Sequence, residues 1–252
     1  DIRPLEILNA LRVIEKNGKL EALRKTRQLC SQIFDYAIAT GRATINPAST
    51  LSSVVLHPEK QQRRMLSEEQ LGAFMYQMKV SGNFMSLVTQ ILVLTAVRTG
   101  ELRLATWDEI DFTNALWVIP KERMKMRRPH VVPLSHQTQM LLKEIKIITA
   151  PRNSELVIPG VYRDNQPRGR GCINEFLQQV GWHTFTTAHG FRHTFSTILH
   201  DHDFSSAWIE LQLAHVDKNI MRGTYNHAQY LDGRREMMQW YADYIDSLSE
   251  QA

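Results

Sequence analysis

Hydrophobic residues recur at helical spacing from the start of the chain to about residue 45. A first run contains Leu5, Leu8, Leu11 and Ile14 and ends at Asn17-Gly18. A second run extends from about Leu20 to Thr40, and Gly41 follows it as the expected C-cap. Most apolar residues of the second run share one broad face: Leu23, Leu29, Ile33, Phe34, Tyr36 and Ala37. The pattern predicts two helices before a turn at Asn46-Pro47.

The pattern changes between about Leu51 and Arg64, where the residues are mostly polar. Ser67 then stands three residues before Gln70, which is the spacing of a capping box that opens a new helix. These features predict a linker and a domain boundary near residues 62–66. We therefore divide the chain into a first domain, residues 1–62, and a second domain, residues 63–252.

The second domain begins with helical spacing over about residues 68–79 and 84–97 and then changes to short runs of β-forming residues. Those runs are Glu109–Phe112, Leu116–Ile119 and His130–Leu134. They predict a small three-stranded antiparallel sheet. After Ser135 the pattern is helical to the end, apart from a long loop at about residues 150–170. The predicted fold class is mainly α with one small sheet (α+β).

Composition sets broad limits on function. Of 252 residues, 43% are hydrophobic and 22% are charged, which is typical of a globular protein and not of a disordered chain. The formal net charge of +4 permits an anionic partner without requiring one. The two cysteines have neither a disulfide framework nor a zinc-binding spacing. No apolar stretch approaches the roughly 20 residues that span a bilayer, so we expect no membrane partner.

Two basic features are candidates for binding an anion. Arg98 follows an apolar helix in Thr95-Ala-Val-Arg98-Thr-Gly-Glu101, where packing could fix its guanidinium as a phosphate clamp. The same arginine could instead pair with Glu101 or cap a helix. Residues 121–130 carry five Lys/Arg against one acid between two predicted strands. That composition is typical of a hairpin that contacts DNA, but also of a solvated turn.

Histidines supply the next candidates. His189 and Arg192 are three residues apart and share a helix face. His189 and His193 have the spacing of two zinc ligands, but Gly190 stands where the zincin motif has glutamate, so we predict no metal site. His215 ends Leu211-Gln-Leu-Ala-His215, and Tyr225 follows ten residues later. A lone tyrosine is usually a core or interface residue.

The order of six residues resembles the tyrosine recombinase (phage integrase) family: Arg98, Lys125, His189, Arg192, His215 and Tyr225. The stretches around Arg98 and around His189-Gly-Phe-Arg-His-Thr-Phe are similar to family motifs, and the resemblance covers about residues 65–240. The ending Tyr225-Asn-His-Ala-Gln-Tyr230-Leu looks most like integrases of satellite prophages and pathogenicity or genomic islands. The sequence departs from the commoner pattern in having Leu-Ala-His instead of Leu-Gly-His, and ten instead of nine residues from His215 to Tyr225. Tyr230 is the nearest rival of Tyr225 and falls outside the expected context.

The resemblance implies phosphoryl transfer on DNA without a cofactor, metal, ATP or small-molecule substrate. Tyr225 would attack a phosphodiester and become linked to the DNA 3′ end, while Arg98, Arg192 and His215 stabilise the phosphate charge. His189 would act as a base or orienting group, and Lys125 as the acid for the leaving 5′ oxygen. Contacts with DNA are expected from five further arginines: Arg123, Arg127, Arg128, Arg168 and Arg170.

The implied task is integration and excision of a prophage or genomic island, in the bacterial cytoplasm at the nucleoid. The implied partners are double-stranded DNA attachment sites, further copies of the chain in a tetramer, an excisionase and a host DNA-bending factor. Residues 1–62 would be the C-terminal part of a helical core-binding domain, and residues 63–252 the catalytic domain. Because the chain starts with Asp1 and not Met, we expect it to be truncated from a longer protein.

Other interpretations stay open at this point. Resolution of plasmids, or topoisomerase-like nicking and closing, would use the same six residues. A non-catalytic DNA-binding module is less favoured because all six positions are filled, and a metal-dependent hydrolase because an acidic ligand is missing. The C-terminal helix, about Gly233–Leu248, would pack either on its own domain or on a neighbouring subunit through its large apolar residues: Met237, Met238, Trp240, Tyr241 and Tyr244.

Overall fold

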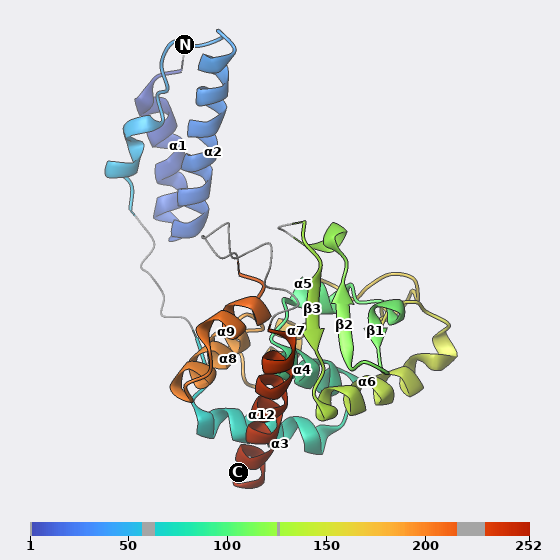
Figure 1. The fold of residues 1–252 in the computed structure, drawn as a ribbon. Coiled ribbons are helices and arrows are strands. Elements are labelled where there is room, and N and C mark those ends of the chain that lie inside the picture. Colours follow the sequence, from blue (N-terminus) through green and yellow to red (C-terminus); the bar gives the residue numbers. More distant parts are fainter. Residues whose placement is uncertain (1, 57–63, 125–126, 216–229) are drawn as a thin grey trace. The chain divides into compact units, whose positions relative to one another are not determined.

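A computed structural model describes residues 2–56, 64–124, 127–215 and 230–252 (Figure 1). Contacts divide the chain into two compact units, Asp1–Gln62 and Arg63–Ala252. The first unit is helical, and the second combines helices with a small antiparallel sheet. The predicted fold class, mainly α with one small sheet, is therefore confirmed.

The first unit is a helical hairpin of α1 (Pro4–Lys16) and α2 (Leu20–Ala39), followed by a short 3₁₀ helix, Ser49–Ser53. Gly18 separates the helices with a left-handed φ of 67°, as expected for a glycine that ends a helix. The small core consists of Ile7, Leu11, Leu23, Ala48, Leu51 and Val55. The apolar face predicted for α2 is only partly covered, because Leu29, Ile33 and Tyr36 are exposed. Helix α1 and the 3₁₀ helix Ser49–Ser53 both contact α2, yet among its residues only Leu23 is fully buried.

The second unit begins with a pair of helices. The predicted capping box opens α3 (Glu68–Ser81): Ser67 Oγ accepts the Gln70 N–H at 3.2 Å, and Gln70 Oε1 accepts the Ser67 N–H at 3.0 Å. The next helix, α4 (Phe84–Thr95), is buried from its third residue to its end. Because α4 is buried on every side, it forms the centre of the core.

Three short strands among the described residues form an antiparallel sheet, in the order β1 (Ile110–Asp111), β2 (Leu116–Ile119) and β3 (His130–Pro133). Ile119 pairs with His130 across β2 and β3. Trp117, Ile119 and Val132 are buried, so the sheet contributes directly to the core. The observed strands match the predicted ones to within two residues at each end.

The remaining described part of the unit is helical apart from the loop before α7. Its helices are α5 (Thr99–Arg103), α6 (His136–Thr149), α7 (Cys172–Gln179), α8 (Gly190–Asp201), α9 (Ser206–Gln212) and α12 (Leu231–Glu250). The C-terminal helix α12 lies against α3 and also contacts α4, α9 and β3 (Figure 1). It buries Met237, Met238 and Tyr241, so it packs on its own domain. No helix in the described part of the chain is both long and apolar enough to cross a membrane.

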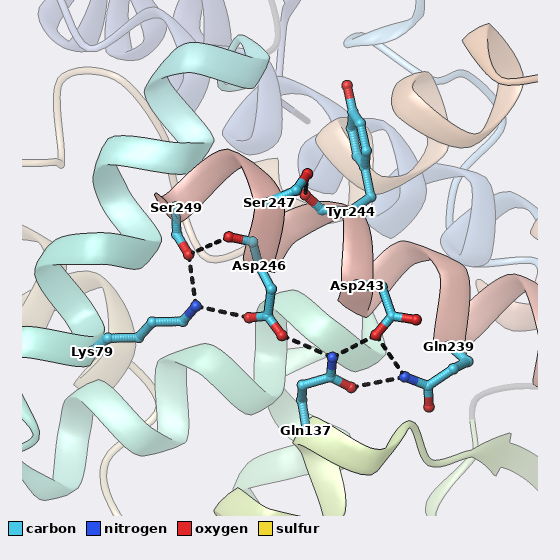
Figure 2. A network of polar contacts seen from close by, with 8 residues as sticks. All are labelled: Lys79, Gln137, Gln239, Asp243, Tyr244, Asp246, Ser247 and Ser249. Carbon is cyan, nitrogen blue, oxygen red and sulfur yellow. Dashed lines mark hydrogen bonds and ion pairs between the residues drawn. The ribbon is translucent and has the colours of Figure 1, made fainter. Parts of the chain in front are cut away.

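Polar side chains on the outer side of α12 bind it to two other helices (Figure 2). Lys79 of α3 donates to Asp246 at 2.7 Å and to Ser249 at 2.6 Å. Gln137 of α6 donates to Asp243 at 2.7 Å and to Asp246 at 2.8 Å. We call this set the α12 surface network: Lys79, Gln137, Gln239, Asp243, Asp246 and Ser249. It fixes α12 along α3 and α6 through the Lys79–Asp246 ion pair and through hydrogen bonds from Gln137 and Gln239.

Candidate active site

Arg98 stands at the junction of α4 and α5. Ala96 has a left-handed φ of 50° and turns the chain at the end of α4. Arg98 is the N-cap residue of α5, where Glu101 Oε2 accepts its backbone N–H at 2.7 Å and Oε1 accepts from its Nη1 at 2.7 Å. The capping and the ion pair considered as alternatives to a phosphate clamp are therefore both present. They fix the guanidinium while leaving the Arg98 side chain 35% exposed.

Arg192 lies in the first turn of α8 and is 3% exposed. Its Nη1 donates to the Ala96 carbonyl, and its Nη2 donates to the Leu213 carbonyl at 2.5 Å. Burial, followed by the neighbouring Arg98 guanidinium, lowers the pKa of Arg192 to about 10. Since this pKa is well above 7, Arg192 keeps its positive charge at neutral pH.

Both guanidiniums meet at the C-terminal end of α9. Arg98 Nη2 donates to the Ala214 carbonyl at 3.0 Å and approaches the Leu213 carbonyl at 3.4 Å, which Arg192 also contacts. The helix ends in a Schellman motif, because the Ala214 N–H donates to the Leu211 carbonyl and the His215 N–H donates to the Glu210 carbonyl, both at 3.0 Å. The last carbonyls of a helix have no partner inside it. They are therefore available to hold two cations close together.

His215 follows this turn and lies beside Arg192. Its Nε2 lies 3.5 Å from Arg192 Nη2, and its Nδ1 lies 2.8 Å from Glu210 Oε2. Three of the six predicted residues, Arg98, Arg192 and His215, thus come together from segments far apart in the sequence.

A buried polar chain lies behind the end of α9. Gln212 donates from Nε2 to the Thr95 carbonyl at 2.8 Å and accepts from Arg234 through Oε1. Arg234, in the first turn of α12, also donates to the Val131 carbonyl of β3 at 2.8 Å. Gln212 and Arg234 are fully buried, and burial lowers the pKa of Arg234 to about 10. These bonds connect α12, α9, α4 and β3 directly beneath the two site arginines.

His130 of β3 is also buried in this region, with 2% of its surface exposed. Burial lowers its pKa to about 3, assisted by the nearby guanidiniums of Arg234 and Arg192. His130 is therefore neutral at pH 7. We refer to Thr95, His130, Gln212 and Arg234 together as the buried support.

The structure describes part of the remaining predicted set. His189 is the N-cap residue of α8, one turn before Arg192, and it is exposed. Its ring packs edge-on against His193, with centroids 5.1 Å apart. Lys125 and Tyr225 lie outside the described residues. Tyr230 is the N-cap residue of α12.

The five arginines predicted to contact DNA differ in their surroundings. Arg123 forms an ion pair with Glu109 and donates to the Glu101 carbonyl at 3.2 Å. The Arg168 guanidinium lies over the Phe84 ring, 4.8 Å from its centroid. Three are exposed and accessible to an external ligand: Arg127, Arg128 and Arg170.

The site is suited to a tetrahedral oxyanion. Arg98 and Arg192 bring two permanent positive charges to one place, while Glu101 balances only one of them. Two guanidiniums and an imidazole are complementary to the non-bridging oxygens of a phosphodiester, where charge accumulates when phosphorus is attacked. Within the described ranges, no group of three or more His, Cys, Asp or Glu could hold a metal ion.

Sequence reasoning did not identify several residues that build the site. Glu101 appeared only as an alternative partner of Arg98, although its position three residues later fits a capping box. Arg234 shares the helical face of Met238 and Tyr241, so the periodicity of α12 could have placed it in the core. Glu210 has the five-residue spacing from His215 that a Schellman motif creates. Gln212 gave no signal, because its partners lie far away along the chain.

Two protein-family models match the chain, one in each unit. A family model described as "Phage integrase family" matches residues 64–231. A second, described as "Phage integrase central domain", matches residues 1–54.

Curated relatives are similar over nearly the whole chain. The chain is 41% identical over 252 residues to prophage integrase IntS of Escherichia coli (strain K12), covering 99% of this chain and 65% of IntS. It is 42% identical over 248 residues to the integrase of Shigella phage Sf6, covering 98% of this chain and 64% of that protein. The integrase of Enterobacteria phage P4 is 32% identical over 270 residues, covering 98% of this chain and 60% of that protein. The chain thus spans less than two thirds of the length of these relatives.

Solved structures establish the fold. A lambda integrase (75–356) dimer bound to a COC′ core site matches with a TM-score of 0.67 and 21% identity, covering 86% of this chain and 77% of that chain. A lambda integrase tetramer bound to a Holliday junction has a TM-score of 0.67 and 20% identity, covering 87% and 66%. The Tn1549 transposon integrase (aa 82–397) with circular intermediate DNA has a TM-score of 0.66 and 16% identity, covering 94% and 85%.

Proposed function

The chain belongs to the phage integrase family, and on that premise we propose that it is a tyrosine site-specific recombinase. It cuts and rejoins DNA through a covalent 3′-phosphotyrosine in order to integrate and excise a prophage or genomic island. The observation that carries this proposal is the convergence of Arg98, Arg192 and His215 at the end of α9. That arrangement offers a phosphodiester two fixed positive charges and an imidazole.

The proposed reaction conserves the number of phosphoester bonds. The hydroxyl oxygen of Tyr225 attacks phosphorus, and the bond from phosphorus to the DNA 5′ oxygen breaks. The tyrosine proton passes to His189 or to water, and the leaving oxygen takes a proton from Lys125. Attack by a DNA 5′-hydroxyl reverses these steps and releases the tyrosine. Because the phosphotyrosine keeps the energy of the broken bond, no ATP is required, and the arginines supply the charge that a metal ion would otherwise provide.

The proposed partners follow from the relatives. Lambda integrase has been solved as a dimer on a DNA core site and as a tetramer on a Holliday junction. By analogy, this chain acts on double-stranded attachment sites as a tetramer, with an excisionase and a host DNA-bending factor directing the reaction, in the bacterial cytoplasm at the nucleoid. The exposed Arg127, Arg128 and Arg170 are the proposed contacts with the DNA backbone.

The two units have different proposed roles. Residues 1–62 form the C-terminal part of a helical core-binding domain, and residues 63–252 form the catalytic domain. The match of residues 1–54 to the phage integrase central domain supports the first assignment, and the match of residues 64–231 supports the second.

A suicide DNA substrate tests the proposal directly. The full-length gene product is incubated, with EDTA present, with a nicked duplex taken from the junction between the mobile element and its host chromosome. We expect a protein–DNA adduct that survives SDS and disappears in Tyr225→Phe. An adduct that persists in Tyr225→Phe but is lost in Tyr230→Phe would reassign the nucleophile.

The same assay separates the alternatives. Absence of any adduct with junction DNA would favour a non-catalytic DNA-binding module, and a requirement for metal would favour a hydrolase. Integration and resolution both form the covalent adduct. A recombination assay between paired sites is therefore needed to distinguish them. Joining of sites on two separate DNA molecules supports integration, whereas exclusive joining of sites on one molecule would contradict it.

A further inference from the structure

Glu210 contacts His215 through both its backbone and its side chain. The Schellman motif that ends α9 joins the His215 N–H to the Glu210 carbonyl at 3.0 Å. The same motif brings the Glu210 side chain beside the imidazole, where Oε2 lies 2.8 Å from Nδ1. The end of the helix therefore sets the separation and direction of this pair.

The two nitrogens of the His215 ring face groups of opposite character. Nδ1 faces the carboxylate of Glu210, and Nε2 lies 3.5 Å from Nη2 of Arg192. A carboxylate only accepts hydrogen bonds and a guanidinium only donates them. The arrangement is therefore consistent with a proton on Nδ1 and a lone pair on Nε2.

We propose that Glu210 is a positioning residue for His215: it holds the proton on Nδ1 and so directs Nε2 toward the phosphate. This inference rests on the proposed function, because it concerns the same phosphate site. When a phosphodiester is bound, Nε2 takes a proton from solvent and donates it in a hydrogen bond to a phosphoryl oxygen. The Glu210 carboxylate then balances the positive charge on the ring, and no covalent bond to phosphorus changes in this step.

The other charged groups of the site are bonded to other partners, so Glu210 is the acid that can position His215. Glu101 is the other acid of the site, and both of its carboxylate oxygens are bonded to Arg98. Arg192 places its Nη1 and Nη2 on backbone carbonyls, and no acid contacts it among the described residues. The only carboxylate within hydrogen-bond distance of the His215 ring in the described part of the chain is therefore that of Glu210.

The exposure of Glu210 and His215 predicts whether their interaction affects the stability of the fold or the reaction. The side chains of His215 and Glu210 are 46% and 51% exposed, and ion pairs in contact with water contribute little to stability. DNA bound over the site excludes water, which strengthens the interaction of the carboxylate with the ring. Removing Glu210 should therefore change the reaction far more than it changes the stability of the fold.

Two substitutions separate the hydrogen bond from the charge. Glu210→Met removes the acceptor at nearly constant size, whereas Glu210→Gln keeps an acceptor oxygen and removes only the charge. Glu144→Met is the matched control, since Glu144 is an exposed glutamate of α6 in the same unit. We expect adduct formation on the nicked junction DNA to be about tenfold to a hundredfold slower in Glu210→Met, with Glu210→Gln intermediate. Glu144→Met should stay within about twofold of the wild type, because the proposed interaction is intact.

The protonated ring nitrogen provides a readout that a merely structural role would not change. Long-range ¹H–¹⁵N spectra of the histidine side chains, assigned with His215→Gln, identify which nitrogen carries the proton at a fixed neutral pH. We expect Nδ1–H in the wild type, in Glu144→Met and in Glu210→Gln, and a loss of the Nδ1–H population in Glu210→Met.

The two readouts distinguish failure of this inference from failure of the proposed function. If the wild type forms the adduct and Glu210→Met reacts as fast as Glu144→Met, or keeps the same His215 protonation, the inference is wrong while the function stands. If the wild type forms no adduct but Glu210→Met loses Nδ1–H, the proposed function is wrong while the control of His215 by Glu210 stands.

Discussion

Two polar networks in the second unit hold their charges in different ways. The α12 surface network pairs Lys79 with Asp246 at 2.7 Å, and both side chains keep more than a third of their surface in water. At the site and in the buried support, Arg192 and Arg234 are buried and donate to backbone carbonyls and an amide. Burial lowers the pKa of both arginines to about 10. The Lys79 charge is balanced by a carboxylate inside its own network, whereas the Arg192 charge is held by neutral carbonyls and stays uncompensated by any contacting acid among the described residues.

The two networks should also differ in whether a substitution changes the stability of the fold or the rate of the reaction. A surface ion pair contributes roughly 0–1 kcal/mol, because water screens it and ordering long side chains costs entropy. A buried polar group that loses its partner costs about 1–3 kcal/mol, and more when it is charged. We therefore expect changes near the site to affect catalysis or folding strongly, and changes in the α12 surface network to have small effects.

Of the substitutions proposed, Arg192→Gln should have the largest effect, and that effect should be on the rate of the reaction. Removing one fixed positive charge from the phosphate site should slow adduct formation by about 10²–10³-fold. The free energy of unfolding should fall by about 1–3 kcal/mol, because the Ala96 and Leu213 carbonyls lose their buried partner. Single-turnover kinetics and urea denaturation measure the two quantities. A large loss of stability with unchanged kinetics would instead show that Arg192 is purely structural.

Gln212→Leu should have the largest effect on folding. It leaves the Arg234 guanidinium and the Thr95 carbonyl without their buried partner, at a cost of about 3 kcal/mol. The matched control is Gln137→Leu in the α12 surface network, which should cost less than about 1 kcal/mol because water replaces the lost bonds. Urea denaturation of both variants tests the comparison, and equal costs would refute it.

His130→Gln should change how stability depends on pH. His130 is neutral in the folded protein because its pKa is lowered to about 3, whereas in the unfolded chain it titrates near 6.5. The contribution of neutral His130 to the free energy of unfolding is therefore fully present above about pH 6.5 and is lost as the pH falls toward about 3. At pH 5 the loss amounts to about 2 kcal/mol. Denaturation at pH 7 and pH 5 should show a smaller loss for the variant than for the wild type. An identical loss would contradict the assigned pKa.

Lys79→Met should have the smallest effect. It breaks the ion pair with Asp246 at a surface position, so the free energy of unfolding should fall by less than about 1 kcal/mol. The difference from the wild type should shrink in about 1 M NaCl, where charges are screened within a few ångströms. Thermal denaturation at low and high salt provides the measurement. A loss that persists at high salt would mean that packing, not charge, makes the contribution.

The sequence predicted much of the fold because its signals are local. The capping box at Ser67, the β-forming runs and the periodicity of α12 each specify an element through neighbours within a few residues. Which part of the apolar face of α2 is buried could not be predicted, for a related reason. Helical periodicity shows that Leu29 and Ile33 share a face, but not whether another element covers that face.

The candidate site was predictable only in part. Family motifs indicated Arg98, Arg192 and His215, and these residues do come together. The groups that hold them could not be inferred from motifs, because Leu213 and Ala214 act through their carbonyls, which every residue type possesses. Lys125 and Tyr225 stay predictions. The buried support also depends on contacts between residues more than a hundred positions apart, such as Gln212 and Thr95.

Two left-handed alanines limit how this site can evolve. Ala96 and Ala214 have φ values of 50° and 48°, and their carbonyls accept from Arg192 and Arg98 respectively. Only glycine takes this conformation without strain, asparagine and aspartate tolerate it, and β-branched residues rarely adopt it. Neutral drift at these positions is thereby confined to a few residue types, although neither side chain has any chemistry of its own.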